Sequence, residues 1–171
     1  MLDGIHKIHL IGIGGSGMRA IANILIQKGY DVSGSDVAES AVISKFRDMG
    51  ATVHIGHNKE YVNGVDAIVR STAIREDNPE IVAAKEQGIT ILHRSDIVKA
   101  VLDVTDGIAV AGAHGKTSTT SMIGQILVEA NADPTVIIGG EVDYLKGSSC
   151  LGKGHFSVVE ADESDGSFLK L

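Results

Sequence analysis

The sequence is poor in cysteine and in long apolar runs, and each shortage excludes a class of protein. Among its 171 residues the one cysteine, Cys150, cannot form an internal disulfide, which fits a reducing cytoplasm. No apolar run approaches the roughly 18 residues that a membrane helix needs. Residues 1–7 lack a basic flank followed by an apolar core, so we see no signal peptide. We therefore expect a soluble cytoplasmic protein without a membrane partner.

Basic residues are also fewer than acidic ones, with 15 lysines and arginines against 22 aspartates and glutamates. The formal net charge of −7 argues against a general nucleic-acid-binding protein, because such proteins are normally basic. An acidic protein can still bind an anionic ligand where the site itself supplies hydrogen-bond donors. We therefore expect no nucleic-acid partner, and we look for anion sites in local motifs.

Proline is scarce and glycine abundant, with two prolines against 21 glycines. Apolar runs alternate with helical patterns, which indicates repeated βα units and a parallel sheet. A polar stretch, 103–107, predicts a domain boundary near Asp103. The expected strands are 8–13, 30–35, 52–55, 66–70, 89–92, 108–111 and 156–160. The expected helices are 18–28, 40–49, one that opens at Asn78-Pro79, 97–102 and 117–130.

A first glycine loop, Gly12 to Gly17, has the spacing G-x-G-x-x-G between a predicted strand and a predicted helix. Glycines let backbone N–H groups approach a diphosphate, and the helix points its positive end at that anion. Asp36, at the end of the second predicted strand, can accept a hydrogen bond from a ribose hydroxyl. By itself the pattern fits NAD or FAD, another diphosphate ligand such as a nucleotide sugar, or turn geometry alone.

A second glycine loop, 112–118, reads Gly-Ala-His-Gly-Lys-Thr-Ser between an apolar strand and a helix. Its ending is typical of a phosphate loop, although only two residues separate its glycines. In such a loop backbone amides hold the phosphates, a lysine neutralises the outer oxygens and a hydroxyl ligates Mg²⁺. We predict that ATP is bound by Gly112, Ala113, His114, Gly115, Lys116, Thr117 and Ser118.

The strand 156–160 ends in a carboxylate, Glu160, and an acidic run follows it, Asp162, Glu163 and Asp165. A magnesium ion that bridges phosphates needs only one or two carboxylates, because it keeps several waters. We favour Glu160, the residue nearest the strand end, over the alternative of an acidic solvated turn. The predicted metal ligands are therefore Thr117 and Glu160, and the predicted catalytic residues are Lys116 and Glu160.

Taken together, the motifs resemble the Mur ligases of peptidoglycan synthesis, along essentially the whole chain. They are the runs 12–18, 34–36, 71–74, 76–79, 112–118 and 160–165. The resemblance implies a Rossmann-like parallel-sheet domain, 1–103, that binds UDP-N-acetylmuramate rather than NAD, followed by the first part of a P-loop-type α/β ATP-binding domain, 104–171. Arg94 is a weaker candidate for an anion contact. The implied substrate contacts are Gly14, Gly15, Ser16, Gly17, Met18, Asp36, His57, Ser71, Thr72, Ala73 and Ile74.

The resemblance also implies an activity, the ATP-dependent formation of an amide through an acyl phosphate on UDP-N-acetylmuramate. His114 and the run 162–165 favour L-alanine as the amino acid, and a tripeptide-recycling ligase is the main alternative. An NAD-linked oxidoreductase and a non-catalytic nucleotide sensor are the others. Ala113 stands where the family usually has threonine. Because family members are substantially longer, we expect a fragment that is inactive alone and leaves an apolar face uncovered after Asp103.

Overall fold

The computed structural model describes residues 1–161, and the chain divides into two compact units, Leu2–Arg94 and Ser95–Leu171. The division falls at the start of helix α4 (Arg94–Leu102), whereas the boundary predicted near Asp103 falls at its end. The placement of that boundary therefore stays a proposal. Among the described residues no helix combines the length and apolar character needed to span a membrane.

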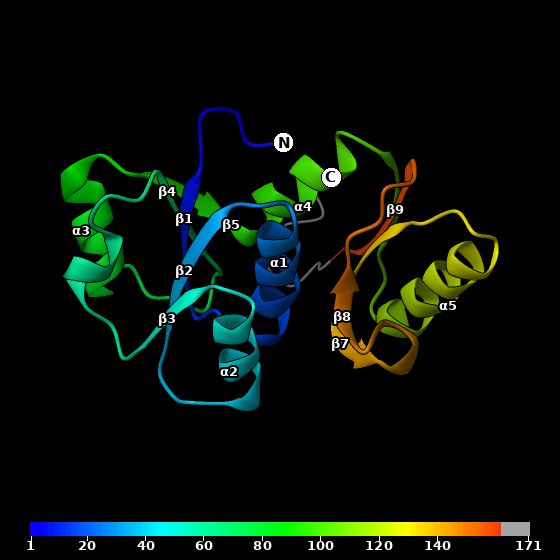
Figure 1. Ribbon diagram of the computed structural model, residues 1–171, viewed down its shortest axis with the longest axis horizontal. Coiled ribbons are helices and arrows are strands. Elements are labelled where there is room, and N and C mark those ends of the chain that lie inside the picture. The colour runs from blue at the N-terminus through cyan, green and yellow to red at the C-terminus, as the bar shows by residue number, and fades with distance from the viewer. Residues whose placement is uncertain (162–171) are drawn as a thin grey trace. The chain divides into compact units, whose positions relative to one another are not determined.

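A five-stranded parallel sheet forms the centre of the first unit (Figure 1). Strands β2 and β3 lie on one side of β1, and β4 and β5 on the other, so the strand order reverses between β1 and β4. In such sheets ligands bind beyond the carboxyl ends of the strands at this reversal. The sheet confirms the predicted α/β class; its strands are β3 (Thr52–Ile55), β2 (Asp31–Asp36), β1 (Lys7–Ile11), β4 (Ala67–Arg70) and β5 (Thr90–His93).

Helices cover both faces of this sheet. Figure 1 shows α1 (Ser16–Gln27) and α2 (Ala41–Asp48) on one side and α3 (Pro79–Gln87) on the other, next to the short helix η1 (Lys59–Val62). Successive side chains of a strand point to opposite faces, so His9 shares the α3 side of β1 with Ile11. Ile11 packs there in an apolar cluster. His9 is thus a fully buried polar side chain beside an apolar cluster.

Helix α3 begins as the sequence predicts. The Asn78 side chain accepts a hydrogen bond of 2.9 Å from the Glu80 N–H, and Pro79 occupies the first helical position. Gly88 ends the helix in the left-handed conformation, at φ 68°. This start places Glu80 in the first turn, where the helix dipole favours a negative charge.

The second unit contains a four-stranded sheet with the strand order β6, β9, β7 and β8. The strand β9 pairs in parallel with both β6 and β7, whereas β8 pairs antiparallel with β7. Helix α5 follows β6, and a short helix, η2, joins β7 to β8. Their bounds are β6 (Asp106–Val110), α5 (Lys116–Glu129), β7 (Thr135–Val142), η2 (Asp143–Leu145), β8 (Gly147–Cys150) and β9 (Phe156–Glu160).

The structure differs from the sequence-based expectation in several places. The first strand stops at Ile11 instead of residue 13, because Gly12 turns the chain at φ 73°. The expected linker, 103–107, is wrong at its end, since Asp106 and Gly107 pair with strand β9. Strands β7 and β8 were not predicted. In each case hydrogen bonding to a distant strand or carbonyl decides the conformation, and local composition does not.

Helix α5 carries exposed apolar side chains on its outer surface. Met122 is 59% exposed and Ile126 is 66% exposed. They agree with the expectation of an uncovered apolar face after Asp103.

Replacing Gly152 with alanine is expected to destabilise the second unit by about 1–3 kcal/mol, the range for overpacking. A Cβ at this position would lie 2.0 Å from the carbonyl oxygen of Asp133 and 2.4 Å from the carbonyl carbon of Pro134, which are backbone atoms that cannot rotate away. Gly147 is the matched control, because its added Cβ meets nothing within 4 Å. Urea unfolding of both variants tests this, and equal midpoints would contradict it.

Candidate nucleotide-binding sites

The first glycine loop leaves β1 at the point where the strand order reverses. The N–H groups of Gly12 and Ile13 both donate to the carbonyl of Ser35, at 2.8 and 3.0 Å, which ties the loop to the end of β2. Gly15 is the N-cap of α1 and brings no side chain to cover the helix end. A helix N-terminus without a capping side chain suits an anion, because its N–H groups and dipole are available.

Asp36 has a role in this loop that the sequence reasoning missed. Its Oδ2 accepts a hydrogen bond of 2.8 Å from the Gly14 N–H, and its Oδ1 accepts one of 2.8 Å from the Val37 N–H. A Cβ on Gly14 would lie 3.0 Å from that same Oδ2, so glycine permits the close approach. The carboxylate therefore holds the loop in shape, and the predicted contact with the uridine remains a prediction.

Two further predicted residues lie against the glycine loop. The Arg94 guanidinium covers Gly17, since a Cβ there would lie 2.5 Å from Nη1. Ile74, in the turn 71–74 after β4, lies beside Gly12, with its Cδ1 3.4 Å from the Cβ position. The structure thus brings a positive charge and the predicted 71–74 segment to the loop.

Met18 is placed differently from the other loop residues. Its side chain is only 3% exposed and its N–H donates to the carbonyl of Gly15 at 3.0 Å. Its contribution to a ligand would therefore be indirect, through the packing that supports the start of α1. A direct contact from Met18 stays a prediction.

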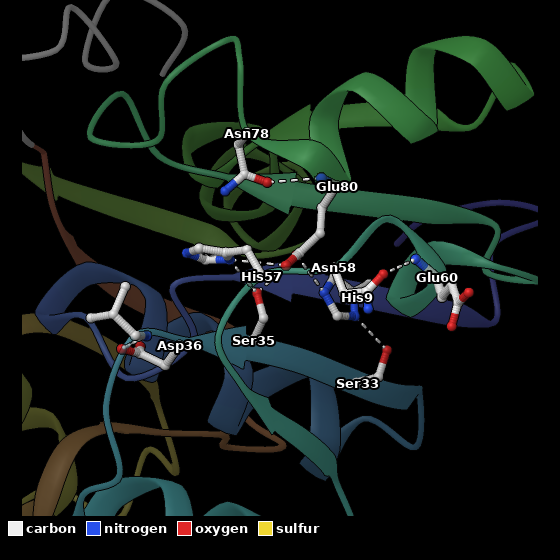
Figure 2. A network of polar contacts seen from close by, with 10 residues as sticks. His9, Ser33, Ser35, Asp36, His57, Asn58, Glu60, Asn78 and Glu80 are labelled. Carbon is white, nitrogen blue, oxygen red and sulfur yellow. Dashed lines mark hydrogen bonds and ion pairs between the residues drawn. The ribbon is translucent and has the colours of Figure 1, made fainter.

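His57 belongs to a network of polar side chains between strands β1 and β2 and helix α3 (Figure 2). Its Nδ1 lies 2.9 Å from Glu80 Oε1 and 3.2 Å from Ser35 Oγ. The other carboxylate oxygen of Glu80, Oε2, accepts from Ser35 Oγ at 2.8 Å and lies 2.9 Å from His9 Nε2. His9 Nδ1 in turn lies 2.9 Å from Ser33 Oγ. Sequence reasoning found His57 but neither Glu80 nor His9.

Glu80 is a carboxylate with no exposed surface. Burial alone would raise its pKa, but the hydrogen bonds from His9, Ser35 and His57 outweigh burial and hold the pKa below its ordinary value. The group is therefore ionised at neutral pH. A buried carboxylate in that state requires donors on both oxygens, and the network supplies them.

A hollow of about 460 Å³ lies elsewhere in the first unit, at the amino ends of β1, β2 and β3. That is the edge of the sheet opposite the glycine loop, so the hollow gives no support to the predicted site. Its lining is Lys7, Asp31, Ser33, Thr52, His54, Glu60, Tyr61, Asn63, Gly64 and Val65.

The second glycine loop joins β6 to α5. Gly112 and Gly115 adopt positive φ, 149° and 78°, and Gly115 is the N-cap of the helix. The Lys116 ammonium donates to the carbonyl of Gly112 at 2.7 Å, so the lysine folds back over its own loop. Ala113, His114 and Ser118 are exposed around the loop. This strand, loop and helix have the order that the phosphate-loop prediction requires.

Glu160 and Thr117, the two predicted metal ligands, lie together although they are far apart in the sequence. The Thr117 hydroxyl donates to Glu160 Oε1 at 3.0 Å, and the Gly139 N–H on β7 donates to Oε2 at 2.7 Å. A hydroxyl and a carboxylate are oxygen donors, which fit Mg²⁺. Within residues 1–161 no group of three or more His, Cys, Asp or Glu side chains could hold a metal. Asp162, Glu163 and Asp165 lie outside the described residues.

These features define a class: an α/β protein with one glycine loop at the switch point of a parallel sheet and a phosphate loop in a second unit. The profile of the "Mur ligase family, catalytic domain" matches residues 7–104. The chain belongs to the Mur ligase family.

Known proteins similar to this chain carry more specific names. A UDP-N-acetylmuramate–L-alanine ligase of Sulfurihydrogenibium sp. is 48% identical over 98% of this chain. The crystal structure of a UDP-N-acetylmuramate–alanine ligase from Thermotoga maritima is 35% identical over 96% of this chain, with a TM-score of 0.87. The structure of a UDP-N-acetylmuramate:L-alanyl-γ-D-glutamyl-meso-diaminopimelate ligase from Neisseria is 28% identical over 95%, with a TM-score of 0.85. The chain spans 37%, 39% and 54% of these proteins, respectively.

Proposed function

We propose that this chain is the part of an ATP-dependent ligase that binds UDP-N-acetylmuramate and begins the ATP site, in a cytoplasmic reaction that adds L-alanine. The observation that best supports this proposal is the hydrogen bond between Thr117 and Glu160 beside a phosphate loop. The same chain also has the glycine loop at the switch point of the first sheet. An oxidoreductase that binds NAD has no need for the second loop. The 48% identity to an L-alanine ligase favours L-alanine as the amino acid.

Each unit would contribute binding and charge neutralisation. In the first, the loop 14–17 with Arg94 would hold the UDP diphosphate, and the turn 71–74 would lie alongside it. In the second, Lys116 would leave the Gly112 carbonyl to contact the outer phosphates of ATP. Thr117 and Glu160 would hold Mg²⁺, which offsets charge on the transferring phosphoryl group. Positioning of the lactyl carboxylate against that group would supply most of the remaining rate enhancement.

The first test is a calorimetric titration of the chain with UDP-N-acetylmuramate, with NADH in parallel. Saturable binding of the UDP-sugar alone is the expected result, because the glycine loop and Arg94 present donors for one diphosphate and His57 lies at the same edge of the sheet for one nucleoside. Binding of NADH alone would overturn the proposal. A chain that binds neither would show that the glycine loop serves turn geometry only.

Replacing Arg94 with methionine is expected to weaken UDP binding about tenfold or more, the effect of losing a charge-assisted hydrogen bond. Methionine keeps much of the apolar stem while removing the positive charge that lies on Gly17. Arg75→Met is the control, because that exposed arginine pairs with Asp77 in the turn before α3. Calorimetry with UDP at two salt concentrations measures both, and equal losses in the two variants would contradict a local role.

A tripeptide-adding ligase is the second candidate, favoured by the TM-score of 0.85 to the Neisseria structure. Both candidates share UDP-N-acetylmuramate, so binding to this chain does not separate them. A full-length ligase that begins with these 171 residues, offered L-alanine or the tripeptide, would separate them by which amine releases phosphate.

A further inference from the structure

The network around Glu80 contains more hydrogen-bonding groups than a single buried pair requires. One carboxylate faces two imidazoles and one hydroxyl, and it is reached from strands β1 and β2, from the loop after β3 and from helix α3 (Figure 2). His9 and Glu80 are fully buried, whereas the His57 side chain is 22% exposed. The network therefore joins the core of the first unit to a residue at the ligand edge of the sheet.

The groups that face each imidazole determine which of its nitrogens carries the proton. An ionised carboxylate only accepts, so the nitrogen that faces it must carry a hydrogen. His57 Nδ1 faces Oε1, and His9 Nε2 faces Oε2. In its neutral form His57 is then the Nδ1–H tautomer, and its Nε2, on the far side of the ring from Glu80, carries a lone pair.

His9 acts as a brace for this arrangement. Its Nε2–H donates to Glu80, and its Nδ1 can accept from the Ser33 hydroxyl, so the buried ring is satisfied at both nitrogens. Together with Ser35 it holds Oε2, which leaves Oε1 for His57. The carboxylate cannot rotate without breaking two bonds to its other oxygen.

We propose that Glu80, braced by His9, is a positioning residue that holds His57 as the Nδ1–H tautomer, so that Nε2 accepts a hydrogen bond from the nucleoside of the bound UDP-sugar. The inference rests on the proposed function for the identity of the ligand. An acceptor at His57 Nε2 selects ligands that place an N–H or O–H donor next to that nitrogen. A uracil ring offers the imide N–H and a ribose offers hydroxyls, whereas cytosine has no hydrogen on the matching ring nitrogen.

Glu80→Gln is the sharpest variant because it changes one atom. Two donors, Ser35 Oγ–H and His9 Nε2–H, meet at the Oε2 position, so the glutamine oxygen belongs there. The amide nitrogen then takes the Oε1 position and donates to His57 Nδ1. His57 must move its proton to Nε2, and an acceptor becomes a donor at the ligand edge. We expect UDP affinity to fall about tenfold to a hundredfold, as for an unsatisfied polar contact.

The first measurement does not use Glu80→Gln. Nitrogen-15 NMR of the unmodified chain, with the His57 signals assigned by comparison with His57→Gln, reports the tautomer of the neutral ring. The Nδ1–H form supports the proposal, and the Nε2–H form overturns it. This readout stays decisive if Glu80→Gln fails to fold.

The second measurement is the affinity for UDP and CDP in the unmodified chain, Glu80→Gln and Glu76→Gln. Glu76 lies on the surface before α3 and serves as the control for the same chemical change. We expect weaker UDP binding and a switched tautomer in Glu80→Gln only. Preference for UDP over CDP, lost in Glu80→Gln, assigns the contact to the base; equal binding of UDP and CDP, both weakened in Glu80→Gln, assigns it to the ribose.

The two proposals fail in different ways. If the unmodified chain does not bind UDP, the proposed function fails and the nucleoside contact fails with it. If UDP binds and His57 is the Nε2–H tautomer, only the positioning role of Glu80 fails. If Glu80→Gln switches the tautomer yet binds UDP with unchanged affinity, His57 does not accept from the ligand and the inference is overturned.

Discussion

Glu80→Ala is expected to lower the unfolding free energy by about 2–6 kcal/mol, because each of two buried donors that loses its acceptor costs about 1–3 kcal/mol. Glu80 and His9 have no exposed surface, so water cannot replace the carboxylate. The Nε2–H of His9 and the hydroxyl of Ser35 would both lose their acceptor in the core. Urea unfolding followed by circular dichroism measures the loss.

Glu76→Ala is the matched control for this experiment. Glu76 pairs with Arg70 and Lys85, but its side chain is 60% exposed, and exposed pairs contribute about 0–1 kcal/mol. Glu80 in the first turn of α3 and Glu76 in the turn before that helix should therefore differ by several fold in their effect on stability. Similar losses in the two variants would show that the Glu80 network is not a source of stability.

The pH dependence of the Glu80 effect has a definite direction. The pKa of Glu80 is lowered from its ordinary value of 4.5, so ionisation of Glu80 favours the folded state. Its contribution is fully present above about pH 4.5 and is lost as the pH falls through the folded-state pKa. The difference between the unmodified chain and Glu80→Gln should accordingly shrink on acidification below pH 4.5. A difference that grows in that range would contradict the ionised carboxylate.

The local sequence was sufficient to predict those elements whose own residues mark where they begin. Asn78 and Pro79 mark the start of α3, and the glycine runs mark both loops, because capping and positive φ are properties of single residues. The meeting of Thr117 with Glu160 was also within reach, since parallel strands and their following loops meet at one sheet edge. The first two predictions depended on short-range geometry, and the Thr117–Glu160 contact depended on the parallel pairing of β6 with β9.

The Glu80 network and strand β7 could not be predicted in this way, because they depend on contacts between residues far apart in the sequence. Glu80 reads as an ordinary acidic residue in a helix first turn, and its partner His9 is 71 positions away. The one available signal was His9 itself, a histidine inside the apolar strand Lys7–Ile11, which demands a buried partner. Strand β7 carries two glycines, Gly139 and Gly140, which weaken a strand pattern. Gly139 is needed there because a Cβ would lie 3.1 Å from Glu160 Oε2.

The other large effect concerns Glu160, in a full-length ligase that begins with this chain. Glu160→Gln is expected to lower kcat about 100-fold to 1000-fold, the range for losing one group that stabilises transition-state charge. Glutamine keeps an oxygen for the Gly139 N–H and a nitrogen that can donate to Thr117 Oγ1, so the fold of the site is retained. What disappears is the negative charge that would hold Mg²⁺ next to the phosphates. Phosphate release with saturating substrates measures the change.

The dependence on magnesium separates a metal ligand from a structural carboxylate. If Glu160 holds the ion, the Mg²⁺ concentration for half-maximal activity rises in Glu160→Gln and remains unchanged in Glu129→Gln, where an exposed glutamate ends α5. If Glu160 only ties Thr117 to Gly139, glutamine preserves both ties, and the activity and Mg²⁺ requirement of the variant stay those of the unmodified enzyme. The two roles use the same two hydrogen bonds, so geometry alone is compatible with both. Charge is what distinguishes them, because only the metal requires it.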